Sequence, residues 1–231
     1  MRKRRWCYEG AIQVNFRHSY YRGADSVDYQ GFPIFEADEV ASLIPHGAMV
    51  AFSGFTPAGA AKAIPRALAR RACDLHAAGL PFQLRVLTGA STGRSLDEAL
   101  AQAEAISWRA PYQSSATLRD QINRGDVDFV DMHLSQVPQS TLGGFFGKVD
   151  FAVIEASDIT PDGRVYLTTS VGASPAFLHA AEHVIVELNR REGHHQSPIA
   201  SEGPSGPVLW QVPPCVPRVP PGLLGSGRIR P

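Results

Sequence analysis

The stretch AFSGFTPAGAAKAIP, residues 51–65, joins an apolar run to a helical pattern through a loop of small residues. The run AMVAFSG, residues 48–54, is typical of a buried strand, and RALARRACDLH, residues 66–76, has the pattern of a helix that follows a first-turn proline. Gly54 and Gly59 lie in the loop between them, around a Thr-Pro pair. Because glycine has no Cβ, such a loop can bring the backbone close to another group.

The alternation of strand and helix continues outward from this stretch to about residue 189. Apolar runs predict strands at residues 48–54, 82–89, 105–110, 127–134, 149–157 and 183–189. Helical patterns occupy residues 35–44, 65–76, 95–105, 115–125 and 174–182. Several strands are apolar throughout, which is typical of parallel strands covered on both faces. The sequence therefore predicts an α/β fold with an open, mostly parallel sheet and helices on both faces.

The chain divides into three segments whose residue patterns differ. Residues 1–33 have no steady period and are predicted to be irregular, and residues 34–192 form the α/β domain. In residues 193–231 the pattern stops, and nine of the 18 prolines of the chain fall in residues 197–231. Proline at this density is incompatible with helices and central strands, so we predict a disordered tail.

Composition excludes several classes of protein. The formal net charge is zero, with 22 basic and 22 acidic residues, so no overall field favours nucleic acid or an anionic membrane. The cysteines Cys7, Cys73 and Cys215 are too widely spaced for a zinc motif or a disulfide framework. No apolar run reaches the roughly 18 residues of a membrane span, and the basic start MRKRR lacks the apolar core of a secretory signal. We therefore expect a cytoplasmic protein without a metal site, with a mitochondrial location as the weaker alternative.

Small-residue loops follow two of the predicted strands. One contains Gly54 and Gly59, and the other begins at Thr88 and Gly89. In open α/β sheets, ligands bind at the carboxyl ends of strands. Both loops are therefore candidates for ligand contact, although a plain strand-to-helix turn explains the same residues.

Several blocks of the sequence, in a fixed order, resemble one enzyme family. They are GFTPAGAAKAIPRALARRA (54–72), VDMHLSQVPQ (130–139), VDFAVIEASDITPDGRVYLTTSVGASPAF (149–177) and AEHVIVELN (181–189). Together they resemble the amino-terminal half of the acetyl-CoA hydrolase/CoA-transferase family over roughly residues 35–190. The resemblance implies a CoA-transferase-like fold with coenzyme A as a substrate and no cofactor. It implies that the loop with Gly54, Phe55, Thr56, Pro57 and Gly59, together with Thr88 and Gly89, lines the acyl-CoA cleft.

The resemblance also implies a mechanism and a partner. Members move coenzyme A from an acyl-CoA to a carboxylate such as acetate or succinate, and some release the acid to water. In such families a glutamate attacks the thioester carbonyl, coenzyme A leaves, and an acyl-glutamyl anhydride forms. That glutamate belongs to the carboxyl-terminal half, whose pattern does not follow residue 189 here. We expect a truncated or frame-shifted member, or a short paralogue, that is inactive alone and self-associates or pairs with a carboxyl-terminal half.

Individual residues allow functional and structural interpretations. Glu155 ends a strand and is the best acidic candidate for catalysis within the domain, yet it also suits a structural role. Lys62 could contact a coenzyme A phosphate or simply be a solvated lysine on a helix. For His133, a structural hydrogen bond is favoured over a role as a catalytic base. Ser174 is the predicted N-cap of the last helix. The SEG triplet at Ser201 resembles the family's nucleophile motif only by coincidence, because it lacks the asparagine.

The competing hypothesis is a protein without catalysis. It would be an α/β module that binds an acyl-CoA or regulates a full-length relative by pairing with it. A nucleotide-binding or sugar-phosphate-binding protein of the same topology is a third hypothesis, which rests on fold analogy alone. The sequence leaves open the acyl donor, the acceptor acid, and the choice between transfer and hydrolysis.

Overall fold

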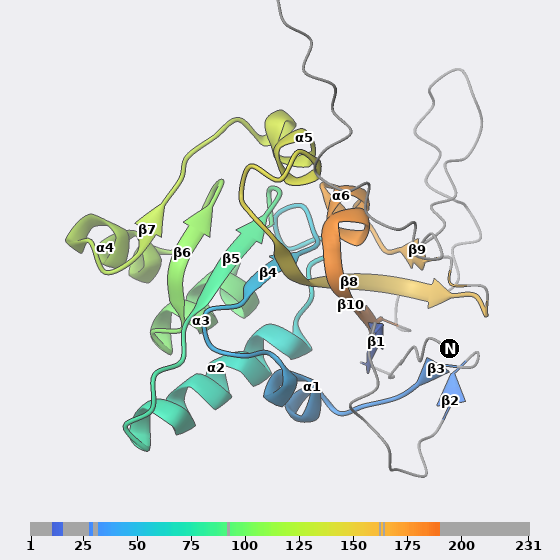
Figure 1. Cartoon of the computed structure of the whole chain (residues 1–231), viewed down its shortest axis with the longest axis horizontal. Coiled ribbons are helices and arrows are strands. Elements are labelled where there is room, and N and C mark those ends of the chain that lie inside the picture. The colour runs from blue at the N-terminus through green and yellow to red at the C-terminus, as the bar shows by residue number, and fades with distance from the viewer. Residues whose placement is uncertain are drawn as a thin grey trace, which may run out of the picture.

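The structure is a computed structural model that describes residues 11–15, 28–29, 32–91, 93–161, 163 and 165–189. Its centre is one sheet with the strand order β1-β10-β8-β4-β5-β6-β7, and β9 pairs with β8 at its side (Figure 1). The strands are β1 (Ala11–Asn15), β4 (Met49–Phe52), β5 (Leu84–Thr88), β6 (Ile106–Ala110), β7 (Asp128–Phe129), β8 (Val149–Ile159), β9 (Val165–Leu167) and β10 (Ala181–Leu188). A separate small sheet pairs β2 (Asp28–Tyr29) with β3 (Phe32–Pro33).

The strands from β10 to β7 are parallel, and β1 and β9 pair antiparallel with their neighbours. The predicted open, mostly parallel α/β sheet is therefore confirmed. From β4 the chain builds outward through β5, β6 and β7, and then returns to place β8 on the other side of β4. The strand order reverses between β4 and β8, and this is the switch point at which open α/β sheets bind ligands.

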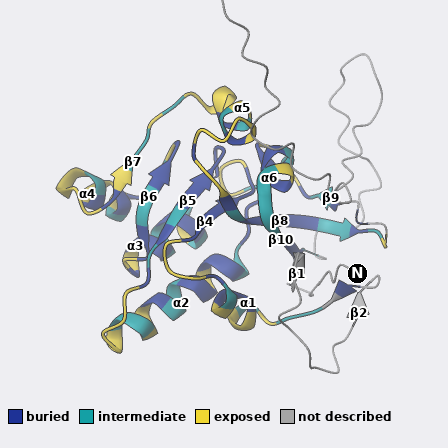
Figure 2. Cartoon of the chain, viewed as in Figure 1, coloured by how far each residue is buried: buried dark blue, intermediate teal, exposed yellow. Residues whose placement is uncertain are grey.

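Helices cover both faces of the sheet. One face carries α1 (Ala37–Leu43), α2 (Ala63–Ala77), the π-helical turn η1 (Arg94–Glu98), α3 (Ala99–Gln102) and α4 (Ala116–Arg124). The other carries α5 (Val137–Leu142), which follows the 3-10 turn η2 (Leu134–Gln136), and α6 (Ser174–Ala180). Figure 2 shows buried residues on the strands and on the inner sides of the helices, with exposed residues on the outer sides.

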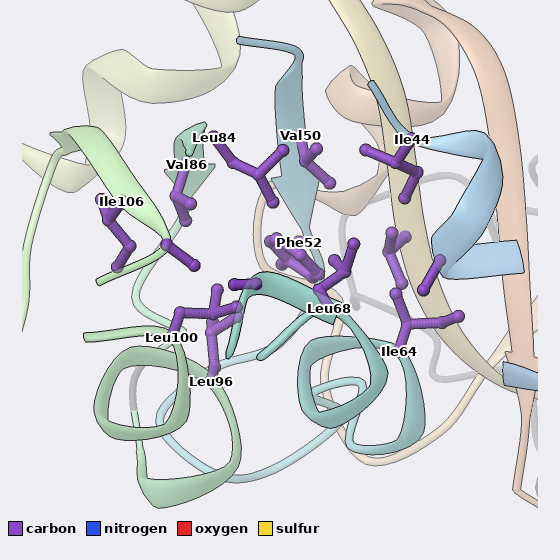
Figure 3. Close-up of a cluster of buried hydrophobic side chains, with 14 of the residues drawn as sticks. Ile44, Val50, Phe52, Ile64, Leu68, Leu84, Val86, Leu96, Leu100 and Ile106 are labelled. Atoms are coloured by element: carbon purple, nitrogen blue, oxygen red, sulfur yellow. The ribbon is translucent and has the colours of Figure 1, made fainter. Parts of the chain in front are cut away.

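Alternation along each strand divides the core into two clusters. On β4, Val50 and Phe52 pack against α2, while Met49 and Ala51 belong to the opposite cluster. Figure 3 shows the first cluster, in which Ile64 and Leu68 of α2 lie below Phe52. Because neighbouring side chains point to opposite faces of a strand, β4, β5, β6, β8 and β10 each contribute to both clusters.

Most predicted elements appear within a few residues of their expected bounds, with informative exceptions. The predicted strand 127–134 shortens to the two residues of β7, and α5, which was not predicted, follows it after η2. Part of the N-terminal segment expected to be irregular forms β1, which pairs with β10. Ser174 is not the N-cap of α6, because Ala173 takes that position and the Ser174 hydroxyl makes no capping bond. The predicted disordered tail lies outside the described residues.

Leu68→Ala should reduce the free energy of unfolding by about 2–5 kcal/mol, because Leu68 is fully buried between α2 and the sheet. Leu80→Ala is the matched control, since Leu80 is 53% exposed. It should change stability by less than about 0.5 kcal/mol. Urea denaturation of both variants measures the difference, and equal losses would contradict the described core.

Candidate functional site

The loop after β4 is closed by its own hydrogen bonds at the switch point. Ser53 Oγ donates to Gly59 O at 2.8 Å and accepts from the Glu155 backbone N–H at 2.9 Å, so the loop is tied to β8. The Phe55 N–H donates to Ala58 O at 2.9 Å, and the Ala58 N–H donates to Phe55 O at 3.1 Å. The loop is therefore a compact turn held against Glu155, which lies within β8 and does not end the strand as the sequence predicted.

The two glycines of this loop are buried and closely packed. A Cβ on Gly54 would lie 2.9 Å from Ala60 Cα and 2.9 Å from Ser91 Oγ. A Cβ on Gly59 would overlap Ser170 Oγ and lie 3.2 Å from the Ser170 backbone nitrogen. Both glycines have positive φ, 118° and 61°. The close approach that the sequence predicted exists, and in this structure it joins the loop to neighbouring protein loops.

Phe55, Thr56 and Pro57 form the exposed tip of the loop. Phe55 is 54% exposed, and Thr56 and Pro57 are exposed as well. Thr56 has a φ of 54°, although its N–H is held by Ala90 O at 2.8 Å. A β-branched residue with positive φ is strained, and such strain gathers at functional sites. The tip combines strain, exposure and a position at the switch point.

The second candidate loop, after β5, is buried. Thr88 is fully buried, and its hydroxyl donates to Gly89 O at 2.8 Å while accepting from Arg109 Nη1 at 2.9 Å. A Cβ on Gly89 would lie 3.3 Å from Ala173 Cβ, so this loop packs on the segment before α6. The seven predicted cleft residues therefore divide into an exposed group, Phe55, Thr56 and Pro57, and a buried group, Gly54, Gly59, Thr88 and Gly89.

An arginine in the middle of the fold holds the second loop in place. Arg109 of β6 is fully buried and pairs with both Asp97 carboxylate oxygens, at 3.0 and 3.2 Å. It also donates to Ser91 O at 3.1 Å. Burial raises the pKa of Asp97 above its usual range, against the lowering effect of the adjacent Arg109. This buried ion pair and its extra bonds tie Arg109 to Asp97 and to the loop after β5.

Glu155 lies under the first loop and is 2% exposed. Its Oε2 pairs with Lys62 Nζ, and its Oε1 accepts from Thr168 Oγ1 at 2.9 Å. Lys62 also donates to Ala60 O at 2.9 Å and keeps 44% of its side chain exposed. Because both of its oxygens have partners, the Glu155 carboxylate fits a structural role in holding the loop better than a role as the nucleophile that attacks a thioester. Lys62 is an ion-pair partner, a role that differs from both sequence-based interpretations.

A second carboxylate, that of Glu187 on β10, lies beside Glu155. The two residues are direct partners in the parallel register of β8 and β10. Glu187 is 5% exposed and accepts backbone N–H bonds from Lys62, Ala63 and Ile64 at 2.8–3.2 Å. Burial raises the pKa of Glu187 above its usual value; the α2 N–H groups lower it, and Glu155 raises it further.

Sequence reasoning missed Arg109, Asp97 and Glu187 as part of this site. A charged residue within a short apolar strand was the available signal for Arg109 and Glu187, because a buried charge needs a partner. His133, by contrast, does take the structural hydrogen bond that was favoured: its exposed ring bonds Ser135 Oγ through Nδ1 at 2.7 Å.

Within the residues that the structure describes, no cluster of three or more histidine, cysteine, aspartate or glutamate residues is arranged to hold a metal ion. No helix among those residues is both long enough and apolar enough to cross a membrane.

Comparisons with known proteins identify relatives of the chain. The family described as "Acetyl-CoA hydrolase/transferase N-terminal domain" matches residues 26–199. Over 166 residues the chain is 54% identical to propanoyl-CoA:succinate CoA transferase of Escherichia coli, covering 72% of this chain and 33% of that protein. It is 36% identical to succinyl-CoA:acetate CoA-transferase of Clostridium kluyveri, over 78% of this chain and 32% of that protein. It is 40% identical to acetyl-CoA hydrolase of Eremothecium gossypii, over 66% of this chain and 30% of that protein.

Solved structures give the same fold. Glutaconate coenzyme A-transferase from Acidaminococcus fermentans matches with a TM-score of 0.52 at 14% identity, over 64% of each chain. An acyl-CoA transferase from Escherichia coli O157:H7 matches with a TM-score of 0.51 at 12% identity, over 62% of this chain and 39% of that one. The chain spans about a third of the length of the curated relatives it matches.

Gly59→Ala should reduce the free energy of unfolding more than Gly79→Ala does. Both glycines have positive φ, 61° and 74°, so both alanines carry about 1–2 kcal/mol of backbone strain. Only Gly59 has protein atoms where its Cβ would lie, since Gly79 has none within 4 Å. Denaturation of the two variants isolates the packing cost, and equal losses would contradict the described contact with Ser170.

The stability of the protein should depend on the pH through Glu187. The pKa of Glu187 is raised in the folded state, so the folded protein binds a proton at this carboxylate more tightly than the unfolded protein does. The stability that this proton contributes is therefore fully present below the unfolded pKa of 4.5. Stability from this group is then lost as the pH rises from 4.5 through the raised folded pKa. Glu187→Gln should remove that fall in urea denaturation measured between pH 4.5 and 7.5.

The control is Glu182→Gln on the same strand. The bond from Lys148 lowers the pKa of Glu182, so its small contribution has the opposite sign and is lost as the pH falls. Identical pH profiles for the wild type and Glu187→Gln would show that Glu187 does not titrate as its burial requires.

Proposed function

Since the chain belongs to the acetyl-CoA hydrolase/transferase family, whose N-terminal domain it carries, we propose that it supplies an acyl-CoA-contacting loop to a coenzyme A-transferring enzyme. The chemistry moves coenzyme A between a short acyl-CoA and a carboxylate such as acetate or succinate. The names of the relatives support these substrates, because they include propanoyl-CoA, succinyl-CoA, succinate and acetate. Within metabolism, this role belongs to the use of acetate and related short acids.

One observation carries the proposal: the exposed, strained tip Phe55–Pro57 stands at the switch point of the sheet. Open α/β folds bind ligands at that point. Beneath the tip the loop is anchored by Ser53 and Lys62, so the tip stands on a rigid base. Rigid support is what a loop needs to position a reacting thioester. Gly54, Gly59, Thr88 and Gly89 support the tip from below and shape the wall of the site.

The covalent step requires a carboxylate from outside the described residues. A glutamate must attack the thioester carbonyl, so that the carbon–sulfur bond breaks and coenzyme A leaves as the thiolate. Glu155 contacts the loop through Ser53 and Lys62, and both of its carboxylate oxygens already have partners. We therefore infer that the nucleophile comes from the two thirds of the relatives that this chain does not match, and that the chain is inactive alone.

The partner is the matching carboxyl-terminal part, or a second copy of the chain. Phe145 is 71% exposed and packs edge-on against Phe146, and Leu142 is also exposed. Exposed apolar side chains of this size favour association. Coenzyme A enters as a substrate, no cofactor is required by the chemistry, and the cytoplasm is the proposed location.

A binding role without catalysis is the second candidate function. The full engagement of Glu155 favours it, because a domain that holds an acyl-CoA without a free nucleophile would bind and not turn over. Such a module would act by pairing with a full-length relative. Addition of the missing part separates the two candidates.

The purified chain should release no free thiol from acetyl-CoA or propanoyl-CoA, with or without succinate, because both oxygens of Glu155, which contacts the loop, already have partners. Activity should appear when the unmatched carboxyl-terminal two thirds of the Escherichia coli relative is added, and hydroxylamine should then trap a modified glutamate in that added part. Ellman's reagent follows the thiol, and mass spectrometry locates the glutamate.

Two outcomes decide between the accounts. Robust turnover by the chain alone that disappears in Glu155→Ala would place the nucleophile in this domain and refute the proposal. Binding of acetyl-CoA that never leads to turnover in the mixture would favour the binding module.

A further inference from the structure

A carboxylate from a strand distant in the sequence caps the start of helix α2. Glu187 Oε1 accepts from the Lys62 N–H at 2.8 Å and from the Ala63 N–H at 2.9 Å, and its Oε2 accepts from the Ile64 N–H at 3.2 Å. Lys62, the residue that precedes the helix, makes no side-chain cap of its own. The first N–H groups of a helix lack intrahelical partners, so Glu187 takes the place of a local N-cap across 125 residues of sequence.

The same point of the chain is tied to the loop and to β8. The backbone of Lys62 binds Glu187, while its ammonium binds Glu155 and Ala60 O. Glu155 and Glu187 are register partners on adjacent strands, so the two carboxylates hold Lys62 by its backbone and by its side chain. The end of the loop is therefore fixed to both β8 and β10.

The beginning of the loop is fixed to the same place. Ser53 Oγ donates to Gly59 O and accepts from the Glu155 N–H, which joins both ends of the turn to one residue of β8. Residues 55–57 at the tip are exposed, Ala58 and Lys62 are partly exposed, and the rest of residues 53–62 is buried. Any shift of the α2 start would be transmitted through Lys62 and Ala60 to this tip.

We propose that Glu187 is a positioning residue for the loop at residues 53–62, setting the place of the Phe55–Pro57 tip through the start of α2 and through Lys62. The functional meaning of this inference rests on the proposed substrate role of the tip. The positioning itself is measured without any ligand, so its failure is distinct from a failure of the proposed function.

Hydrogen exchange resolved by residue tests the proposal in Glu187→Leu. The amides of Phe55 and Ala58, which bond across the turn, and of Thr56, which donates to Ala90 O, should exchange about tenfold faster or more than in the wild type. The amides of Val86 and Leu87 in β5 should keep their rates. Glu182→Leu makes the same change on the same strand, beside Lys148, and should leave both groups of amides unchanged.

Two results would overturn the proposal. Faster exchange confined to Lys62, Ala63 and Ile64 would make Glu187 a helix cap without influence on the loop. An equal acceleration in β5 and in the turn would make it a general contributor to the fold.

Lys62→Met keeps the test decisive if Glu187→Leu does not fold. Lys62 is half-exposed, and this variant removes the links to Glu155 and Ala60 O while leaving the backbone bonds to Glu187 in place. The amides of Phe55, Thr56 and Ala58 should again exchange about tenfold faster. Unchanged exchange there would refute the transmission through Lys62 that the proposal requires.

Discussion

Two buried carboxylates that lie side by side on β8 and β10 hold the candidate site together. Glu155 and Glu187 are register partners, and each takes its compensation from the start of α2: one from the Lys62 ammonium, the other from three backbone N–H groups. Buried charges without such partners would cost several kcal/mol each. The folded sheet and the start of α2 therefore require each other, and the loop between β4 and α2 has little freedom left.

This constraint divides the loop into a base and a tip. Gly54 and Gly59 pack against Ser91 and Ser170 from neighbouring loops, where a larger residue would collide. Above them, Phe55 to Pro57 are exposed, and Thr56 is strained. Buried Arg109 gives the β5 loop a similar rigid base. A rigid base of this kind is what the proposed contact with a thioester requires.

The sequence predicts the parallel sheet and the position of the β4 loop because both depend on local patterns: apolar runs, glycines and the order of the elements. The helical pattern predicted at residues 115–125 ends at Gly125, which is the left-handed C-cap of α4. It does not predict Glu187 as the cap of α2 or Arg109 as the partner of Asp97, because these pairs depend on which strands become neighbours. The predicted Ser174 cap is wrong because α6 begins at Ser174 itself, one residue earlier than its local signal indicates.

The central claim is that the Phe55–Pro57 tip is where this domain meets an acyl-CoA. Titration of acetyl-CoA into the isotope-labelled chain, followed by amide chemical shifts, tests it most directly. The account predicts that the amides of Phe55, Thr56 and Ala58 shift with saturation, while those around Leu80, which is 53% exposed against 54% for Phe55, do not. Saturating shifts elsewhere on the domain, with the tip amides unmoved, would contradict it.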